Sequence, residues 1–533
     1  MMKLVRAIWG RQSRRARGTS RAGGQRGQAV SPHLEVNLAR LRELFGASGD
    51  LAVRYFRPGL APEVPAAVVY IDGLVDTALL DRHVLEPLLR SERGRAGLLR
   101  GAGAALASYA SERLVSAAEV ELVTALEEAS CQLLAGRAVV FWQGSTAALA
   151  VTVRGWAARA VEEPGTESVI RGSREGFTED LRTNLALLRR RIRSPGLRVE
   201  YLTLGRRTNT QVAVVYVDAV ASPSTVAEVK RRISGIDIDS VLESGYIEQY
   251  IEDSPWSPFA TVANSEKPDV VAAKLLEGRV AILVDGTPFV LLVPYLFIES
   301  LQSAEDYYSR PFYVSMLRLI RLAAFGVSVL LPALYVAAVS FHQELIPASL
   351  AITVAATREG TPFPAIIEAL GMGVVFEILR EAGVRLPRPI GQAVSIVGAL
   401  VIGQAAVSAG LIGSLMVIVV ALTGVATFVV PAQIDAGIVL RAVYTVLAGV
   451  FGLYGIVLGL VVTVAHAAVL TSFGAPYLSP VAPFSRTGAG DTIVRVPLWT
   501  MRLRPEALRS PDRVRRRGRV RVGVQPMRGR RET

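Results

Sequence analysis

The apolar residues in the first part of the chain occur in short runs at helical or strand spacing. "LEVNLARLRELFG" (34–46) repeats them every three or four positions, which predicts an amphipathic helix. "AAVVYIDGLVD" (66–76) predicts a buried strand that ends in a turn, and "RAVVFWQGSTAALAVTV" (137–153) predicts a hairpin around Gly144. We therefore expect a first α/β subdomain over residues 34–160.

The same mixture of helices and strands follows this subdomain. "FTEDLRTNLALLRRRI" predicts a helix with Thr178 as its N-cap, and the arginines of its last turn suit the helix dipole. After it come the apolar strands "TQVAVVYVD", "GRVAILVDG" and "PFVLLVP" and the helix "STVAEVKRRISGI". We assign a second α/β subdomain to residues 161–293.

Long uncharged segments then replace the short apolar runs. Within residues 389–485 the only Asp, Glu, Lys or Arg residues are Asp435 and Arg441. An apolar helix of about 20 residues crosses the hydrocarbon core of a bilayer. We expect a helical transmembrane domain over residues 294–485, with apolar segments at 322–341, 391–411, 413–430, 436–451 and 453–473.

One segment leaves the topology open. Residues 364–382 include Glu368, Glu377, Arg380 and Glu381, which are too many charges for a lipid-exposed span. This segment either lies at the interface or enters the membrane against protein. The five apolar segments alone put the chain ends on opposite sides. If both chain ends lie on the same side of the membrane, residues 364–382 also cross it, or one pair of the later apolar segments forms a single helix or a re-entrant helix.

These patterns predict an α/β N-terminal soluble region of two subdomains followed by an all-α polytopic membrane domain. The net charge of +13 arises mainly from arginines in the tails at 1–33 and 486–533. Basic residues beside spans stay on the cytoplasmic side, so we expect both tails and the soluble domain to be cytoplasmic and to face anionic lipid. Because no aromatic and basic surface accompanies these runs, we expect no nucleic acid partner.

Side chains that mark an enzyme or a metal centre are scattered. The four histidines lack metal-ligand spacing, no phosphate-binding GxxxxGK[ST] motif is present, and Cys131 is the single cysteine. For Asp72 and Asp76 we favour turn capping over acid–base or metal chemistry. His466 lies in an apolar segment, where we expect a hydrogen bond across helices rather than a proton relay. We expect no catalytic residue, no metal and no cofactor.

The stretch "RPIGQAVSIVGALVIGQAAVSAGL" (388–411) combines small and polar residues. Small residues recur every four positions and allow close helix packing. The polar side chains either bond neighbouring helices of one subunit or, when symmetric copies surround an axis, line a water-filled path. The candidates for a pore and its gate are Gly391, Gln392, Ser395, Ala399, Gly403 and Gln404.

The two charges of the apolar region fall near the expected end of a span. We therefore expect Asp435 and Arg441 to reach the interface by snorkelling, and we favour a gating ion pair less.

Several long blocks resemble the GerA family of spore germination proteins, the A-type subunits of germinant receptors in endospore-forming bacteria. The resemblance runs from about residue 66 to 484. It is carried by "YIDGLVD", "RGSREGFTEDLRTNLALLRRRI", "VLESGYIEQYIED", "LLEGRVAILVDGTPFVLLVP", "SAEDYY", "FEILREAGVRLPRPIGQAVSIVGALVIGQAAV" and "SFGAPYLSPVAPF".

The resemblance implies a soluble domain in the spore core and a membrane domain in the inner spore membrane. It implies a homo-oligomeric ring, a pentamer, that forms a cation channel opened when nutrients are sensed. The implied partners are a transporter-like B subunit that binds the germinant and a lipoprotein C subunit. The segment from Gly391 would then be the pore-lining helix. This chain departs from the family pattern at Ser173, at Gly373 and in "NSEKPD" (264–269). The loss of an acidic residue at Gly373 argues against an ion-coordinating or coupling role for that position.

Other classes remain as alternatives. A non-conducting scaffold could relay germinant binding to another channel. A secondary transporter is disfavoured because no matching pair of broken helices occurs in two halves. An enzyme is the least favoured class.

Overall fold

The computed structural model describes residues 28–516 apart from 47, 92–106, 118, 154, 156–163, 166, 168, 170, 359, 386–400, 402 and 486–487. The chain divides into two compact units, each with its own hydrophobic core. The first unit contains the residues up to Glu43 together with 52–71 and 75–154. The second contains 44–51, 72–74 and the chain from Gly155 onward.

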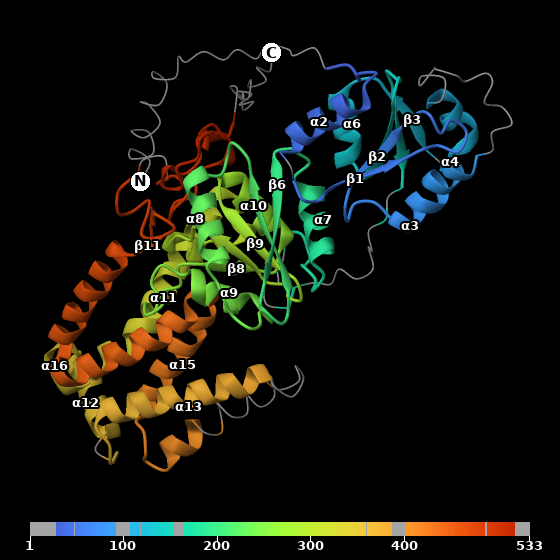
Figure 1. Cartoon of the computed structure of the whole chain (residues 1–533). Helices are drawn as coiled ribbons and strands as arrows, with labels where there is room; N and C mark the ends of the chain where they lie inside the picture. Colours follow the sequence, from blue (N-terminus) through green and yellow to red (C-terminus); the bar gives the residue numbers. More distant parts are fainter. Residues whose placement is uncertain are drawn as a thin grey trace, which may run out of the picture. The chain divides into compact units, whose positions relative to one another are not determined.

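The first unit is a five-stranded sheet between helices (Figure 1). Its strands lie in the order β1-β2-β4-β5-β3. In chain order the elements are α2 (Leu34–Phe45), β1 (Leu51–Phe56), β2 (Ala66–Ile71), α3 (Thr77–Leu80), η1 (Asp81–Leu85), α4 (Glu86–Arg90), η3 (Ala110–Leu114), β3 (Val120–Val123), α6 (Leu126–Leu134), β4 (Arg137–Trp142) and β5 (Ala148–Thr152). Alternate strand residues pack beneath α3, η1 and α4 because strand side chains point to opposite faces.

The α/β part of the second unit is also a five-stranded sheet, in the order β6-β7-β9-β10-β8. Its elements are α7 (Leu181–Arg191), β6 (Leu197–Leu204), β7 (Thr210–Val217), α8 (Pro223–Ser234), α9 (Ser244–Ile251), β8 (Ala263–Ser265), α10 (Pro268–Glu277), β9 (Val280–Val284) and β10 (Val290–Val293). Helices α8 and α9 cover one face, and α7 and α10 cover the other. The predicted fold class of two α/β subdomains before a helical region is confirmed.

The two sheets repeat one architecture. Both follow the same succession of helices and strands and the same strand order. A buried asparagine holds the loop before the first helix of each copy. Asn37 accepts a hydrogen bond from the backbone N–H of Ser31 (2.8 Å) and donates one to its carbonyl oxygen (2.7 Å). Asn184 does the same with Thr178, at 2.8 and 2.5 Å. The subdomains are therefore two copies of one folding unit.

The N-cap of α7 differs from the predicted one. Asp180, and not Thr178, caps the helix, and its Oδ2 accepts a hydrogen bond from the backbone N–H of Thr183 at 2.7 Å. Thr178 is instead bound by Asn184. The two-residue shift arises because Asn184 engages both the backbone and the hydroxyl group of Thr178.

The helical part of the second unit begins with η4 (Phe297–Leu301) and η5 (Ala304–Tyr307). It continues with α11 (Pro311–Ser340), η6 (Gln343–Leu345), α12 (Ala348–Arg358), α13 (Ala365–Arg385), α15 (Ser414–Phe428), η7 (Pro431–Gln433) and α16 (Ile434–Val469). Among the described residues, two helices are long and apolar enough to cross a membrane, at Pro311–Ser340 and Pro431–Val469.

Helix α16 is bent into two arms at Gly452 (Figure 1). Gly452 has φ 62° and ψ −143°, a backbone conformation that is essentially restricted to glycine. The Oη of Tyr444 donates a hydrogen bond to the Oγ1 of Thr463 at 2.9 Å. In a straight helix these residues would lie about 28 Å apart along the axis. The bend confirms the predicted division between the apolar segments at 436–451 and 453–473.

The chain after α16 returns to the α/β part of the same unit. It contains β11 (Thr471–Ser472), β12 (Ala475–Pro476), η8 (Leu498–Thr500) and η9 (Glu506–Leu508). Of the tail expected from 486 onward, the described residues include Leu508, which is 2% exposed, and Asp512, whose backbone N–H donates to the carbonyl oxygen of Ala219 at 3.0 Å. This part of the tail is therefore ordered, and residues 517–533 lie outside the described residues.

Candidate functional site: a charged cavity and an aromatic junction

The predicted pore residues lie largely outside the described part of the chain. This holds for Gly391, Gln392, Ser395 and Ala399. Gly403 is buried, and a Cβ atom there would lie 3.4 Å from Cγ1 of Val417 on α15. Gln404, the next residue, is exposed. Gly403 thus packs against α15 of its own chain, whereas Gln404 is exposed.

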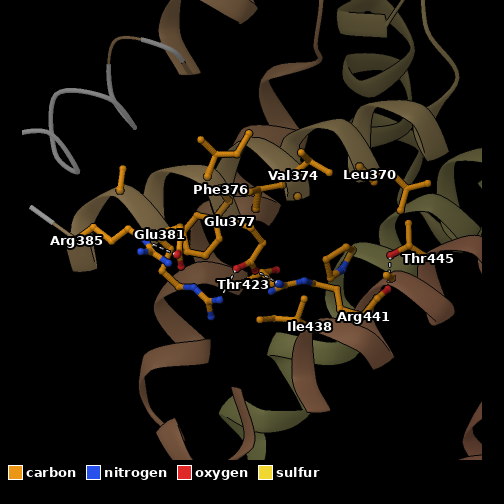
Figure 2. A pocket seen from close by; sticks show the side chains of 18 residues that line it. Leu370, Val374, Phe376, Glu377, Glu381, Arg385, Thr423, Ile438, Arg441 and Thr445 are labelled. Atoms are coloured by element: carbon orange, nitrogen blue, oxygen red, sulfur yellow. Dashed lines mark hydrogen bonds and ion pairs between the residues drawn. The ribbon is translucent and has the colours of Figure 1, made fainter. Parts of the chain in front are cut away.

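A cavity of about 670 Å³ lies between α13, α15, α16 and Pro332 of α11. Leu370, Val374 and Ile438 contribute to its apolar wall (Figure 2). Gly373 also lines the cavity, and a side chain added there would meet open space. A side chain at position 373 would therefore enter free volume.

Charged side chains of two helices meet in this cavity. Arg441 of α16 donates a hydrogen bond to Oε1 of Glu377 on α13, and Nη2 of Arg380 lies 2.9 Å from Oε2 of the same carboxylate. Figure 2 shows Glu377 directed toward Arg441. A charge enclosed by apolar helices is stable only when it is paired. Glu377 therefore holds α13 against α16.

The expected snorkelling of Arg441 is wrong. The residue is only 9% exposed and its guanidinium lies beside Glu377 and, at 3.5 Å, the Oγ1 of Thr427. Asp435 is exposed at the start of α16, as its position near a helix end suggested. The signal that could have identified the pair is the isolation of Arg441, because a lone charge in an apolar region requires a partner of opposite sign.

The other charges of α13 are also paired. Glu368 is 3% exposed, lies 3.6 Å from Nη2 of Arg358 on α12, and accepts a hydrogen bond of 3.3 Å from the backbone N–H of Gly413. Glu381 and Arg385 form an exposed pair one turn apart, at 2.6 Å. These partners explain how a charged segment packs against α15 and α16. Whether this segment lies at the interface or enters the membrane stays a prediction.

A cluster of aromatic rings, the aromatic junction, joins the second α/β subdomain to α11 and α16. Phe259 and Phe297 have centroids 6.3 Å apart, and each lies 6.1 Å from the ring of Tyr477. Phe297 also lies 5.9 Å from Phe325 of α11, and Phe259 lies 6.4 Å from His466 of α16. Edge and tilted ring contacts of this kind stabilise packing beyond the area they bury.

His466 has a different partner from the expected one. Its Nε2 lies 2.9 Å from the Oγ of Ser257, which belongs to the loop between α9 and β8. The hydrogen bond therefore does not link two helices, and it joins the end of α16 to the α/β subdomain.

Hydrogen bonds reinforce the junction. The Oγ of Ser472 donates to the carbonyl oxygen of Thr261 at 2.6 Å and accepts from the backbone N–H of Tyr295 at 2.9 Å. The backbone N–H of Phe473 donates to Oδ2 of Asp253, and the guanidinium of Arg232 stacks 4.3 Å from the Phe473 ring. The end of α16 is thus fixed to the α/β subdomain.

A buried ion cluster fixes the start of α11. Nε of Arg318 donates to Oδ2 of Asp306 at 2.8 Å, and its Nη1 donates to Oδ1 of Asp491 at 2.9 Å. Arg321 reaches the same Asp306, at 2.9 Å. Burial raises the pKa of the Asp491 carboxyl above its usual range, and hydrogen bonds from Tyr307 and Arg318 oppose that rise. Asp491 of the described tail therefore helps to hold the start of α11 in place.

Among the described residues, no group of three or more His, Cys, Asp or Glu side chains could hold a metal ion. In the described part of the chain, the helical region contains a charged cavity and is connected to the α/β subdomain by the aromatic junction.

Comparisons with known proteins agree with the resemblance seen in the sequence. The model of the Bacillus/Clostridium GerA spore germination protein family matches residues 39–507. Spore germination protein KA of Bacillus subtilis (strain 168) is 45% identical over 489 residues, which are 91% of this chain and 88% of that protein. The uncharacterized membrane protein YfkQ of the same organism is 44% identical over 89% of this chain and 91% of its own length.

A solved structure is also similar. The crystal structure of the N-terminal domain of the A subunit of the Bacillus megaterium spore germinant receptor GerK3 is 36% identical, with a TM-score of 0.41, over 51% of this chain and 98% of that chain. From the family match and the identity to spore germination protein KA, we conclude that the chain belongs to the GerA family of spore germination proteins.

Proposed function

We propose that this protein is the A-type subunit of a spore germinant receptor and that it forms an oligomeric, nutrient-gated cation channel in the inner spore membrane. Its soluble domain and both basic tails face the spore core, and the tails contact anionic lipid. Its partners are a transporter-like B subunit, a lipoprotein C subunit and further copies of itself, five in a ring. Family membership over most of the chain carries the proposal.

Two features of the structure support it. Helices α11 and α16 have the length and composition of membrane spans. Gln404 exposes an uncharged amide beside the buried Gly403, an arrangement suited to a helix that packs on one side and faces a hydrated axis on the other.

The decisive experiment measures cation flux and assembly together. The full chain is reconstituted into liposomes with its B and C subunits, and potassium release is recorded after nutrient addition. Replacing Gln404 with leucine, or Ser395 with phenylalanine, should reduce flux while the detergent-corrected mass of the oligomer is unchanged. Val469→Leu, at an 82% exposed position at the end of α16, is the matched control. Unchanged flux would show that the segment containing Ser395 and Gln404 does not line the pore. A monomer at every protein concentration would show that the protein does not form a ring.

A second function is favoured by the aromatic junction. Because both α11 and α16 are anchored to the α/β subdomain, the subunit could act as a non-conducting relay of germinant binding to another channel. In that case, liposomes containing the complete receptor would show nutrient-dependent changes at the junction without ion flux.

A further inference from the structure

Trp256 is almost completely exposed. Its exposed fraction is 98%, whereas Trp142 in the first unit is 1% exposed. A large aromatic ring left in water forgoes the burial that usually stabilises it. The surroundings of this exposed side chain therefore bear on its role.

The loop that carries Trp256 is held in place on both sides. Asp253 is bound by Arg232 at 2.6 Å, and Ser257 by His466 at 2.9 Å. The backbone N–H of Ser257 donates to the carbonyl oxygen of Ser254 at 3.0 Å, which closes a four-residue turn with proline at its second position. Trp256 is the third residue of this turn. The fixed turn thus presents one indole away from the protein.

The contacts of the aromatic junction show where this turn lies along helices α11 and α16. His466, which Ser257 binds, lies 6.4 Å from Phe259, and Phe259 lies 6.3 Å from Phe297. Phe297 lies 5.9 Å from Phe325, three residues after the start of the apolar run of α11 at Leu322. The turn therefore lies where the last arm of α16 ends and the uncharged part of α11 begins.

The opposite ends of these helices also coincide. Gly452, at the bend of α16, has Phe341 and His342 as neighbours, at the end of α11. Residues 322–341 span about 30 Å as a helix, the thickness of the hydrocarbon core. If this layer is the membrane core, the turn lies at its cytoplasmic boundary, where tryptophan side chains concentrate in membrane proteins.

We propose that Trp256 is a membrane-interface anchor, which inserts its indole into the lipid headgroup layer beside the end of α16. The occupant of this surface is the lipid bilayer itself. The inference rests on the membrane insertion of α11 and α16 in the proposed function. The inference goes beyond the proposed function because the α/β subdomain itself then contacts the membrane, through the side chain of Trp256.

The test uses spin labels on the full-length protein in liposomes of phosphatidylcholine and phosphatidylglycerol. In a Cys131→Ser background, single cysteines replace Trp256, Arg207 and Leu334. Arg207 belongs to the β6–β7 turn, at the end of the sheet away from Tyr295, and is the aqueous control. Leu334 is 41% exposed within α11 and is the lipid control.

The measured quantity is the ratio of accessibility to oxygen over accessibility to a water-soluble nickel chelate. We expect the ratio at position 256 to exceed that at 207 several-fold and to remain below that at 334. A ratio equal to that at 207 would overturn the proposal. Low accessibility to both reagents at 256 would also overturn it, because a partner protein or a second copy would then cover the side chain.

The lipid control separates this inference from the proposed function. If position 334 also behaves as an aqueous site, the helical part is not in the membrane and both fail. If 334 behaves as a lipid site and 256 does not, only the anchor fails.

Discussion

Asp306 and Arg318 form an ion pair in which both side chains are 1% exposed, with 2.8 Å between Oδ2 and Nε. Asp306 belongs to η5 and Arg318 to α11. The pair therefore fixes the direction in which α11 leaves the α/β subdomain. Arg321 contacts the same carboxylate.

Replacing Asp306 with alanine should therefore destabilise the protein strongly. The substitution leaves Arg321 without that carboxylate and Arg318 with Asp491 as its acidic partner, and breaking a buried pair costs about 3–5 kcal/mol. The measurement is thermal and denaturant unfolding of the full chain in mild detergent. Glu381→Ala, which removes a 58% exposed partner, is the control and should change stability by less than about 0.5 kcal/mol. Equal effects of the two substitutions would contradict the assigned role of Asp306.

The pair between Glu377 and Arg441 should behave as a coupled unit. Arg441→Met leaves Glu377 in the cavity with Arg380 alone, and we expect a loss of about 2–4 kcal/mol. Adding Glu377→Gln should restore part of that loss, since the unpaired charge is then removed. A double-mutant cycle from unfolding measurements gives the coupling free energy. Strictly additive effects would show that the two side chains do not interact.

Two glycines of the helical region should respond oppositely to alanine. At Gly373 a Cβ atom meets nothing within 4 Å, so Gly373→Ala should stabilise α13 by about 0.5–1 kcal/mol. At Gly424 of α15 a Cβ atom would lie 2.4 Å from the ring of Phe376, so Gly424→Ala should destabilise the protein. Unfolding of the two variants in the same detergent measures the difference. The same sign for both would contradict the packing of α13 on α15.

Stability should depend on the ionisation of Glu248. Burial, followed by the charges of Glu252, Glu243 and Asp435, raises the pKa of the Glu248 carboxyl to about 7. Because the pKa is higher in the folded state, the folded protein is most stable when Glu248 is protonated. The free energy of unfolding therefore falls as pH rises from about 4.5 to 7. Glu248→Gln should therefore stabilise the protein at pH 8, by on the order of 1 kcal/mol after solvent screening, and have little effect at pH 4.

Glu228 supplies a control of opposite sign. Hydrogen bonds from Arg231 and Arg232 lower the pKa of its carboxyl to about 2. Glu228→Gln should destabilise the protein at neutral pH, and the difference should disappear only as pH falls toward 2. If both glutamine variants shift stability in the same direction at pH 8, the charge environment of Glu248 is not the one described.

Local patterns predicted the elements well where short-range physics decides the conformation. The strand at Ala66–Ile71 and the division of α16 follow from the apolar runs at 66–76, 436–451 and 453–473. The partner of His466 was wrong because Ser257 lies in another element, far away in the chain. The cap of α7 was wrong because Asn184, which lies within the helix itself, binds Thr178. Arg441 was wrong because its partner, Glu377, lies 64 residues away.

The repeat of the α/β subdomain had a sequence signal that periodicity alone does not use. "YID" at Tyr70–Asp72 and "YVD" at Tyr216–Asp218 end equivalent strands, and each aspartate accepts a hydrogen bond from the next backbone N–H. The pore candidates are a different case. Four of the six lie outside the described residues, so their assignment stays a prediction.

The attachment of both ends of the helical region to one α/β subdomain has a mechanical consequence. The start of α11 and the end of α16 belong to one rigid frame, so a rotation of the α/β subdomain must carry both ends together. Helix α13 packs on α15 and α16, and its Glu377 accepts a hydrogen bond from Arg441 of α16. Any displacement of α16 relative to α13 must therefore stretch or break the Glu377–Arg441 pair.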